Sequence, residues 1–312
     1  MNFFQTYSRF LSDRLLELLE VSSSDILGSL LLGIPLEYGS EQLNKIKVTG
    51  MLFFFVISGM HLSILHALIY RVARALPLSQ RAMRVMATCG TVLYAAVVGW
   101  SLPIIRTVVM KIYMTLGLMF RRLVSVRFVL FWLVVVYGVV SWLQYELVVF
   151  SPSFLLSYGA VFALLRMQQR KPPRSLYEYV VVSLQTSAHV NAVIAPILLF
   201  FFGEWNPVSL VFSLLFSPLI SLIVSLGFIF LAWVSLSELV FSSSRGVATI
   251  FAPLFDVLLR GFQLLLELSV SFSVVEQFQP TVFLLFLYYF VLLVALPVFS
   301  SVIKRKNATD FL

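Results

Sequence analysis

The feature that most constrains this chain is a succession of long apolar segments, separated by short stretches that carry charges, proline or glycine. Most of them are about as long as a helix that crosses a lipid bilayer. The expected spans cover residues 48–70, 85–100, 102–120, 127–144, 152–166, 179–202, 207–236 and 280–302. Because 60% of the 312 residues are hydrophobic and only 12% are charged, there is room for about seven to nine membrane helices and almost none for a soluble domain. The predicted fold is an all-α, polytopic integral membrane helix bundle.

The N-terminal residues predict a different kind of helix. Within residues 3–32, apolar side chains recur at helical spacing and charged ones lie between them. The apolar set is Phe3, Tyr7, Phe10, Leu11, Leu15 and Leu18, and the charged set is Arg9, Asp13, Arg14 and Glu17. This pattern is typical of an amphipathic interfacial helix that lies on the membrane surface. Gly33, Pro35 and Gly39 then predict a loop over residues 33–47.

Two later segments leave alternatives open. The run 207–236 contains Pro218, and at ~1.5 Å per residue it is longer than a hydrocarbon core of ~30 Å. It is either one tilted, kinked helix or two half-helices. Residues 247–270 are apolar but include Asp256, Arg260 and Glu267, so this segment either spans the membrane or lies at its interface.

The net charge of +8 would suit a nucleic-acid binder, but the basic residues lie in alternate connections. These are Arg71, Arg74, Arg81, Arg84, Arg121, Arg122, Arg127, Arg166, Arg170, Lys171, Arg174, Lys304, Arg305 and Lys306. The connections between them carry Glu146, Glu204 and Glu276 instead. The positive-inside rule therefore predicts that the basic loops and the C-terminus are cytoplasmic. Residues 1–47 and the loops at Glu146 and Glu204 are then predicted to be extracytoplasmic.

Enzyme and metal chemistry find little support in the residue types. The only cysteine is Cys89, and His61 and His66 are five residues apart, whereas a helical zinc pair needs a spacing of four. No cofactor, metal site or catalytic residue is predicted. An intramembrane serine protease is a less favoured reading, because Val56-Ile57-Ser58-Gly59 lacks the first glycine of a Gly-x-Ser-Gly nucleophile motif, although His189 could supply a base; a zinc enzyme is favoured still less.

The most unusual local sequence is the stretch 49–61, TGMLFFFVISGMH, which sets polar residues inside an apolar span. Ser58 and His61 are three residues apart and are expected to share one helical face, while Gly59 lets another backbone approach closely. An ionisable side chain in lipid is costly, so His61 is expected to face the protein interior or a wet cavity. The alternative is a buried histidine that hydrogen-bonds to a neighbouring helix.

The third span carries two cations, Arg106 and Lys111. They are five residues apart, about 140° around a helix, so they cannot both face one narrow pore. Arg106 could contact a passing phosphate, or it could extend to the lipid headgroups.

The order of these motifs resembles a known family. The string VTGMLFFFVISGMHLSIL (48–65), preceded by Leu30 to Gly33, is similar to the Ile-Ser-Gly-x-His stretch in the membrane channel domain of ComEC-type competence proteins. Pro103 to Arg106 with Met110, Ser153 to Tyr158, and Ala195-Pro196 resemble later motifs of that domain in the same order. The resemblance covers residues 25–236.

The resemblance implies a membrane channel component that passes single-stranded DNA across the bacterial cytoplasmic membrane during natural transformation. Expected partners are single-stranded DNA, the lipid bilayer, a separate DNA receptor, a nuclease and a cytoplasmic motor, and the chain could form a homo-oligomer. Residues 48–236 would form the channel domain, between a lead segment (1–47) and C-terminal membrane helices with a basic tail (237–312). The candidate path-lining or DNA-binding residues are Gly50, Ser58, Gly59, His61, Arg106, Ser157, Ser187 and His189.

Several positions depart from the family pattern. Leu155 and His189 stand where glutamine is common, and Ser213 stands where asparagine is common. The oligonucleotide-binding barrel and the metallo-β-lactamase-like domain of longer relatives have no counterpart in this sequence, which looks like the channel domain alone. These departures favour the alternative function, a small-solute transporter or a diverged competence-fold protein that does not move DNA.

Overall fold

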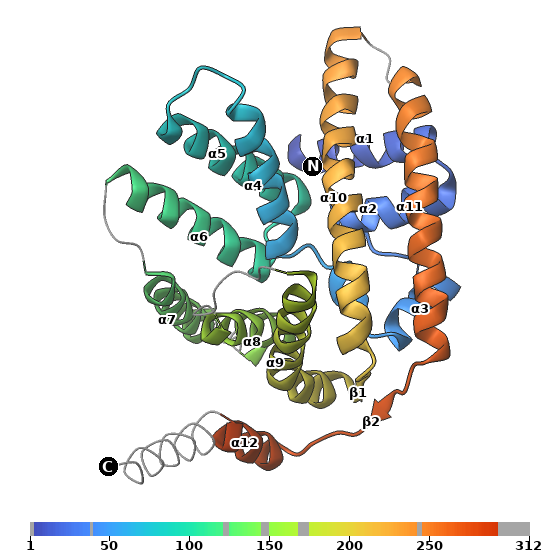
Figure 1. Ribbon diagram of the computed structural model, residues 1–312. Helices are drawn as coiled ribbons and strands as arrows, with labels where there is room; N and C mark the ends of the chain where they lie inside the picture. Colours follow the sequence, from blue (N-terminus) through green and yellow to red (C-terminus); the bar gives the residue numbers. More distant parts are fainter. Residues whose placement is uncertain are drawn as a thin grey trace.

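The structure is a computed structural model that describes residues 3–37, 40–120, 125–144, 150–167, 175–241 and 245–292. These residues are mainly helical, and the prediction of an all-α membrane protein is confirmed (Figure 1). The helices are α1 (Phe3–Leu18), α2 (Val21–Leu32), α3 (Glu41–Val48), η1 (Leu52–Phe54), α4 (Gly59–Ala73), α5 (Gln80–Val98), α6 (Leu102–Met119), α7 (Val126–Gln144), α8 (Pro152–Met167), α9 (Leu176–Phe202), α10 (Ser209–Phe241), α11 (Arg245–Ser271) and α12 (Val282–Phe290). Two short strands, β1 (Glu204–Trp205) and β2 (Glu276–Gln277), pair antiparallel.

Six helical segments in the described part of the chain are long and apolar enough to cross a membrane. They are Leu52–Ala73, Gln80–Val98, Leu102–Met119, Val126–Leu143, Tyr177–Phe202 and Ser209–Ser237. The expected span 152–166 is the shorter helix α8, whose 16 residues extend ~24 Å, less than a hydrocarbon core of ~30 Å. The expected span 280–302 begins with α12, and its residues 293–302 lie outside the described residues.

The larger hydrophobic core surrounds the hairpin formed by α10 and α11, which run side by side in Figure 1. Two pairs of buried phenylalanine rings join these helices: Phe216 and Phe262 have centroids 5.3 Å apart, and Phe230 and Phe255 have centroids 5.6 Å apart. α2 packs against α10 at Gly227, where an added Cβ would lie 2.5 Å from a methyl group of Leu31. The glycine therefore allows α2 to approach the hairpin closely.

Both segments that the sequence left open are continuous helices. α10 contains Pro218 and still runs as one helix of 33 residues, so it is not two half-helices. Residues 247–270 lie within α11, whose buried residues Phe255, Leu259, Phe262 and Leu266 recur every three or four positions. This apolar stripe packs against α10, as expected of an amphipathic helix that covers a core.

The N-terminal segment differs from the predicted single surface helix. The chain breaks after Leu18 into α1 and α2, and in α2 the side chains of Ile26, Leu27 and Leu30 are buried in the larger core. The predicted loop 33–47 contains helix α3. Its start is capped by Ser40, whose Oγ accepts a hydrogen bond from the Leu43 N–H at 3.2 Å. These additional tertiary and local contacts explain why the loop prediction was wrong.

Contacts of the N-terminal segment run along the α10–α11 hairpin from one end to the other. The Tyr7 hydroxyl donates to Ser235 Oγ at 2.7 Å, the Ser23 hydroxyl donates to Asp256 at 3.2 Å, and Lys45 Nζ lies 3.7 Å from a carboxylate oxygen of Glu267. The described residues of this segment therefore extend along the hairpin and are not gathered at one of its ends.

The Tyr7 contact bears on the predicted topology. Glu204 precedes the start of α10, whereas Ser235 lies 26 residues after Ser209, about 39 Å along the helix. That distance exceeds the ~30 Å hydrocarbon core, so α1 and Glu204 lie at opposite ends of a helix long enough to span it. The two segments therefore lie near opposite ends of α10, and the sides of the membrane on which they lie stay a prediction. The predicted loop positions at Glu146, Arg122 and Lys171 fall outside the described residues.

A second, smaller hydrophobic core lies among α6, α7 and α8. Its buried members are Val129, Leu133, Tyr137 and Phe154. α6 contributes to both cores, because Ile104 and Val108 belong to the larger one while Ile105 and Val109 pack against the smaller one. The polar residues of the candidate site lie where these two cores adjoin along α6.

Candidate functional site

The first part of the site is the start of α4. The sequence predicted one span over residues 48–70, but in the structure the helix α4 begins only at Gly59. Ser58 is its N-cap, and the short helix η1 precedes it. Ser58 Oγ accepts a hydrogen bond from the Met60 N–H at 3.3 Å, and the His61 ring nitrogen Nδ1 accepts one from the Ser58 N–H at 3.3 Å. The histidine thus completes a capping box in which glutamate or glutamine is usual. The two residues do come together, but at a helix end instead of on a mid-span face.

His61 keeps one polar atom without a partner. Its side chain is fully buried, and Nε2 has no hydrogen-bond partner among the described residues. A neutral imidazole that accepts at Nδ1 carries its proton on Nε2, so a donor points into the protein interior. A buried donor without a partner is costly, and water or a ligand would relieve that cost.

The second part is Arg106 on α6. Its side chain is 7% exposed, Nη1 donates to the backbone carbonyl of Ser157 on α8, and the guanidinium lies 5.8 Å from the centroid of the Tyr158 ring. Its Nε has no partner, and no carboxylate pairs with it among the described residues. Arg106 therefore does not extend to the headgroups; it is a buried cation held by a carbonyl and an aromatic face.

Gly59 brings the two parts together. A Cβ added at Gly59 would lie 3.0 Å from Thr107 Oγ1 and 3.6 Å from Arg106 Nη2. The start of α4 therefore packs directly against α6 beside the guanidinium, as expected for a glycine at a close helix contact. Gly59, Arg106 and Ser157 form one contiguous cluster, with Ser58 and His61 at the same helix start.

Aromatic residues that were not among the predicted site residues border this cluster. The Phe154 and Tyr158 rings stack with centroids 4.2 Å apart, and Tyr137 of α7 meets Phe154 edge-on at 5.6 Å. The hydroxyls of Tyr137, Tyr158 and Ser157 are buried, and none has a hydrogen-bond partner among the described residues. Each tyrosine sits in a separate apolar helix, so no local pattern could have indicated that they meet.

Two predicted site residues lie elsewhere, against the start of α10. Gly50 has a φ of 71°, and a Cβ there would lie 3.2 Å from the Cβ of Ser209. On α9, the Ser187 hydroxyl donates to the Leu210 carbonyl at 3.0 Å and lies 2.9 Å from Ser213 Oγ. Gly50 thus serves a tight turn and Ser187 an interhelical contact, and neither touches Arg106 or Gly59 through a described hydrogen bond.

His189 is two residues from Ser187 on α9, and its Nε2 is buried without a partner among the described residues. Eight buried side-chain atoms in the described chain lack a partner, and seven of them belong to α4, α6, α7, α8 or α9. They are His61 Nε2, Arg106 Nε, Tyr137 OH, Ser141 Oγ, Ser157 Oγ, Tyr158 OH and His189 Nε2; the eighth is Ser269 Oγ on α11. Five of these eight atoms lie on α6, α7 or α8, the helices of the smaller core.

Lys111, the other cation of α6, is half-buried and lies on a different part of the helix surface from Arg106. Of the two cations of α6, only Arg106 belongs to the cluster with Gly59 and Ser157.

No group of three or more histidine, cysteine or acidic side chains within the described residues is arranged to hold a metal ion.

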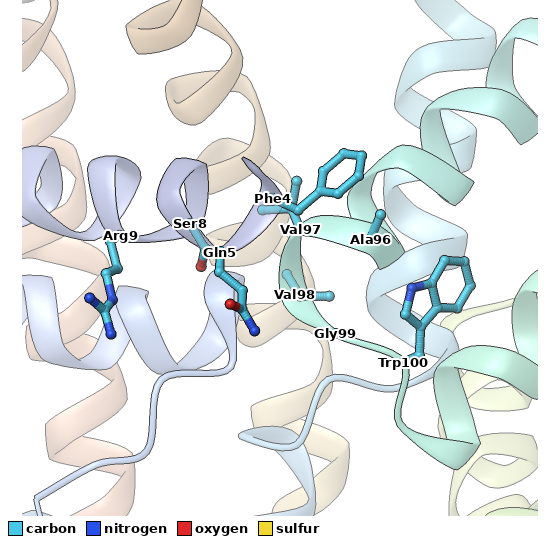
Figure 2. A pocket seen from close by; sticks show the side chains of 9 residues that line it. All are labelled: Phe4, Gln5, Ser8, Arg9, Ala96, Val97, Val98, Gly99 and Trp100. Carbon is cyan, nitrogen blue, oxygen red and sulfur yellow. The ribbon is translucent and has the colours of Figure 1, made fainter. Parts of the chain in front are cut away.

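A separate cavity of about 820 Å³ lies between α1 and the end of α5 (Figure 2). Arg9, Ser8 and Gln5 point to the same side of α1, and Trp100 stands at the other end of the opening. None of the predicted site residues lines it. The cavity is therefore distinct from the Arg106 cluster.

Comparison with known proteins identifies one family. The competence protein family matches residues 30–301, most of the chain, and extends beyond residue 236, where the motif resemblance ended. No curated protein and no solved structure gave a significant match. The helical membrane fold agrees with the family match, and the chain belongs to the competence protein family.

Proposed function

We propose that this chain is the membrane component through which single-stranded DNA crosses the bacterial cytoplasmic membrane during natural transformation. Its family indicates a role in competence in general. The observation that carries the finer proposal is Arg106, a buried cation without a described carboxylate partner, next to three unpartnered hydroxyls. A phosphodiester would supply the missing negative charge and acceptor oxygens.

A DNA strand needs a hydrated path, because phosphates do not cross hydrocarbon. The unpartnered atoms on α4 and α6–α9 are groups that water or phosphate could satisfy in such a path. The nearby aromatic rings of Phe154 and Tyr158 are side chains of the type on which bases stack. Recognition by charge and stacking would not depend on base sequence.

No catalytic step is assigned to the chain in this proposal. A separate receptor would deliver the strand, a nuclease would remove its complement and a cytoplasmic motor would pull it, and copies of the chain could associate. The basic loop at Arg81 would face the cytoplasm, and Glu204 would face the opposite side.

The alternative is a small-solute transporter or a diverged competence-fold protein. Ser213 favours it, because it stands where the family commonly has asparagine and its hydroxyl contacts Ser187 and the Leu210 carbonyl in a closed helix contact. The intramembrane protease reading needs a nucleophile, yet Ser58 Oγ accepts the Met60 N–H at the helix cap.

The decisive test is deletion of the gene in a transformable host with no second copy, followed by measurement of labelled DNA in the cytoplasm. We expect DNA to bind the cell surface and fail to enter. The natural chain supplied in trans should restore entry. Unchanged DNA entry after deletion would reject the conduit in favour of the alternative function.

A further inference from the structure

The described part of α12 makes an unusual attachment to the rest of the protein. None of its residues Val282–Phe290 is buried, and Phe283 and Phe286 are 71% and 73% exposed. Yet the Tyr288 hydroxyl donates to the Ala192 carbonyl at 2.7 Å and the Tyr289 hydroxyl donates to the Val193 carbonyl at 2.6 Å. Apolar burial does not explain the position of α12, so these two hydrogen bonds carry much of the contact.

The acceptors are adjacent backbone carbonyls inside α9, where the backbone is normally self-satisfied. Pro196 explains why the first is available: it lies within α9 and has no N–H, so the Ala192 carbonyl four residues earlier loses its helical donor. The proline ring also crowds that carbonyl and opens the helix locally. In a membrane, a freed backbone carbonyl needs another partner, and tyrosine hydroxyls supply it here.

α9 has two further contacts, one at this stretch and one at its end. On α8, a Cβ added at Gly159 would lie in van der Waals contact with Val193 Cγ1, at 3.4 Å. At the end of α9, the Phe278 N–H donates to the Gly203 carbonyl at 3.2 Å, beside the β1–β2 pair. In Figure 1, α12 follows β2 and lies next to the α7–α9 group. α12 therefore runs back along α9 from the strand pair to the proline.

We propose that Tyr288 and Tyr289 are positioning residues. The Tyr288 hydroxyl replaces the backbone hydrogen bond that Pro196 removes at Ala192, and the Tyr289 hydroxyl binds the next carbonyl, where the proline opens the helix. Together they tie α12 to the break in the helix that carries Ser187 and His189. The hydrogen-bond replacement stands on its own geometry. Its consequence for DNA passage rests on the proposed function. His189 lies one helical turn before Ala192, so a loosened break would change how its unpartnered Nε2 is presented.

The test is a double-mutant cycle between the tyrosines and the proline. In the full-length purified protein, Tyr288→Phe with Tyr289→Phe should increase amide hydrogen exchange over residues 189–199 by about three- to fifteenfold, the factor expected for a hydrogen bond inside a membrane protein. Pro196→Ala restores an N–H for the Ala192 carbonyl. In that background the same tyrosine changes should alter exchange by less than about twofold.

Tyr179→Phe is the matched control, because Tyr179 is an exposed tyrosine near the start of the same helix. It should leave exchange over 189–199 unchanged. Equal effects of the tyrosine changes with and without Pro196, or no effect with it, would overturn the proposal. If Pro196→Ala does not accumulate, the natural proline background decides: an increase confined to 189–199 supports the proposal, and a uniform or absent increase overturns it.

DNA uptake, normalised to membrane-inserted protein, tests the positioning role. It should fall in the double tyrosine variant and recover when Pro196→Ala is added. Uptake that stays at the natural level while exchange rises would overturn the positioning role and leave the hydrogen-bond replacement standing. Failure of the proposed function is a different result, namely normal DNA entry in the deletion strain.

Discussion

Replacement of Arg106 by methionine distinguishes a cation kept for conduction from one kept for stability. Methionine keeps a long side chain without the charge. The change removes the hydrogen bond to the Ser157 carbonyl, which costs about 1.5–3 kcal/mol. It also removes the contact with the Tyr158 ring, which costs about 0.5–2 kcal/mol. It also relieves the cost of burying a charge at membrane depth, about 2.5–3.5 kcal/mol. These contributions largely cancel, so the free energy of unfolding should change by no more than about 2.5 kcal/mol in either direction.

Uptake should respond very differently. Without the buried cation a phosphate finds no positive charge in the cluster, and we expect labelled DNA entry per membrane-inserted molecule to fall at least about tenfold, the loss equivalent to one charge-assisted hydrogen bond. Arg106→Lys should recover part of it, because an ammonium keeps the charge but not the planar fork. Both quantities can be measured on one culture, by fluorescence-detected size exclusion of the solubilised protein and by cytoplasmic DNA.

Lys111→Met provides the matched control, because it removes the same charge from the same helix outside the Arg106 cluster. It should leave uptake per molecule near the natural level. The reasoning fails if Arg106→Met conducts normally, or if both substitutions reduce uptake equally, since the effect would then follow the charge of α6 and not the cluster around Arg106.

Three further predictions follow from the site and the fold. His61→Leu should lower uptake far more than the amount of inserted protein and His61→Asn should recover it; a purely structural histidine would instead lower both together, through a loss of about 1–3 kcal/mol. Gly59→Ala should destabilise the protein by about 1–3 kcal/mol, because a Cβ would lie 3.0 Å from Thr107 Oγ1. Gly261→Ala, with nothing within 4 Å of the added Cβ, should stabilise the protein by about 0.5–1 kcal/mol. Thermal unfolding measures both, and an equal loss of stability in the two variants would contradict the packing at Gly59. In a Cys89→Ser background, single cysteines at Ser8 and Glu204 should label from opposite sides of the membrane, because α1 contacts the far end of α10; labelling of both from outside would instead support the topology predicted from the loop charges.

The sequence predicted the class of fold well, because a membrane span leaves a long apolar run that needs no tertiary information. It also indicated Arg106 and His61, because ionisable residues are rare in such runs. It did not predict that Ser58 and His61 form a helix cap, since the apolar run continues upstream over residues that do not belong to α4. Gly50 was assigned to the path because a glycine in a polar motif does not reveal whether it serves a ligand or a turn with positive φ.

Interhelical partners could not be predicted from the chain alone. The buried hydroxyls of Tyr137 and Tyr158 meet near Arg106 only because α7 and α8 pack against α6. Similarly, the sequence assigned the residues of α2 to the membrane surface. Their burial was missed because the residues of α10 and α11 that cover these leucines lie about two hundred positions later in the chain. Such contacts depend on which helices pack together, and hydrophobic periodicity does not specify that choice.

The contacts between the N-terminal segment and the α10–α11 hairpin have a consequence for biosynthesis. Ser23 and its partner Asp256 are separated by 233 residues. At ~5–20 residues per second, a ribosome needs roughly 12 to 47 s to make the second after the first. During that interval α2 has none of its partners from α10 and α11, and with 12 residues it is too short to span the bilayer by itself. Its leucine-rich surface is then a target for chaperones and proteases, and α2 can be buried only after α10 and α11 have been made.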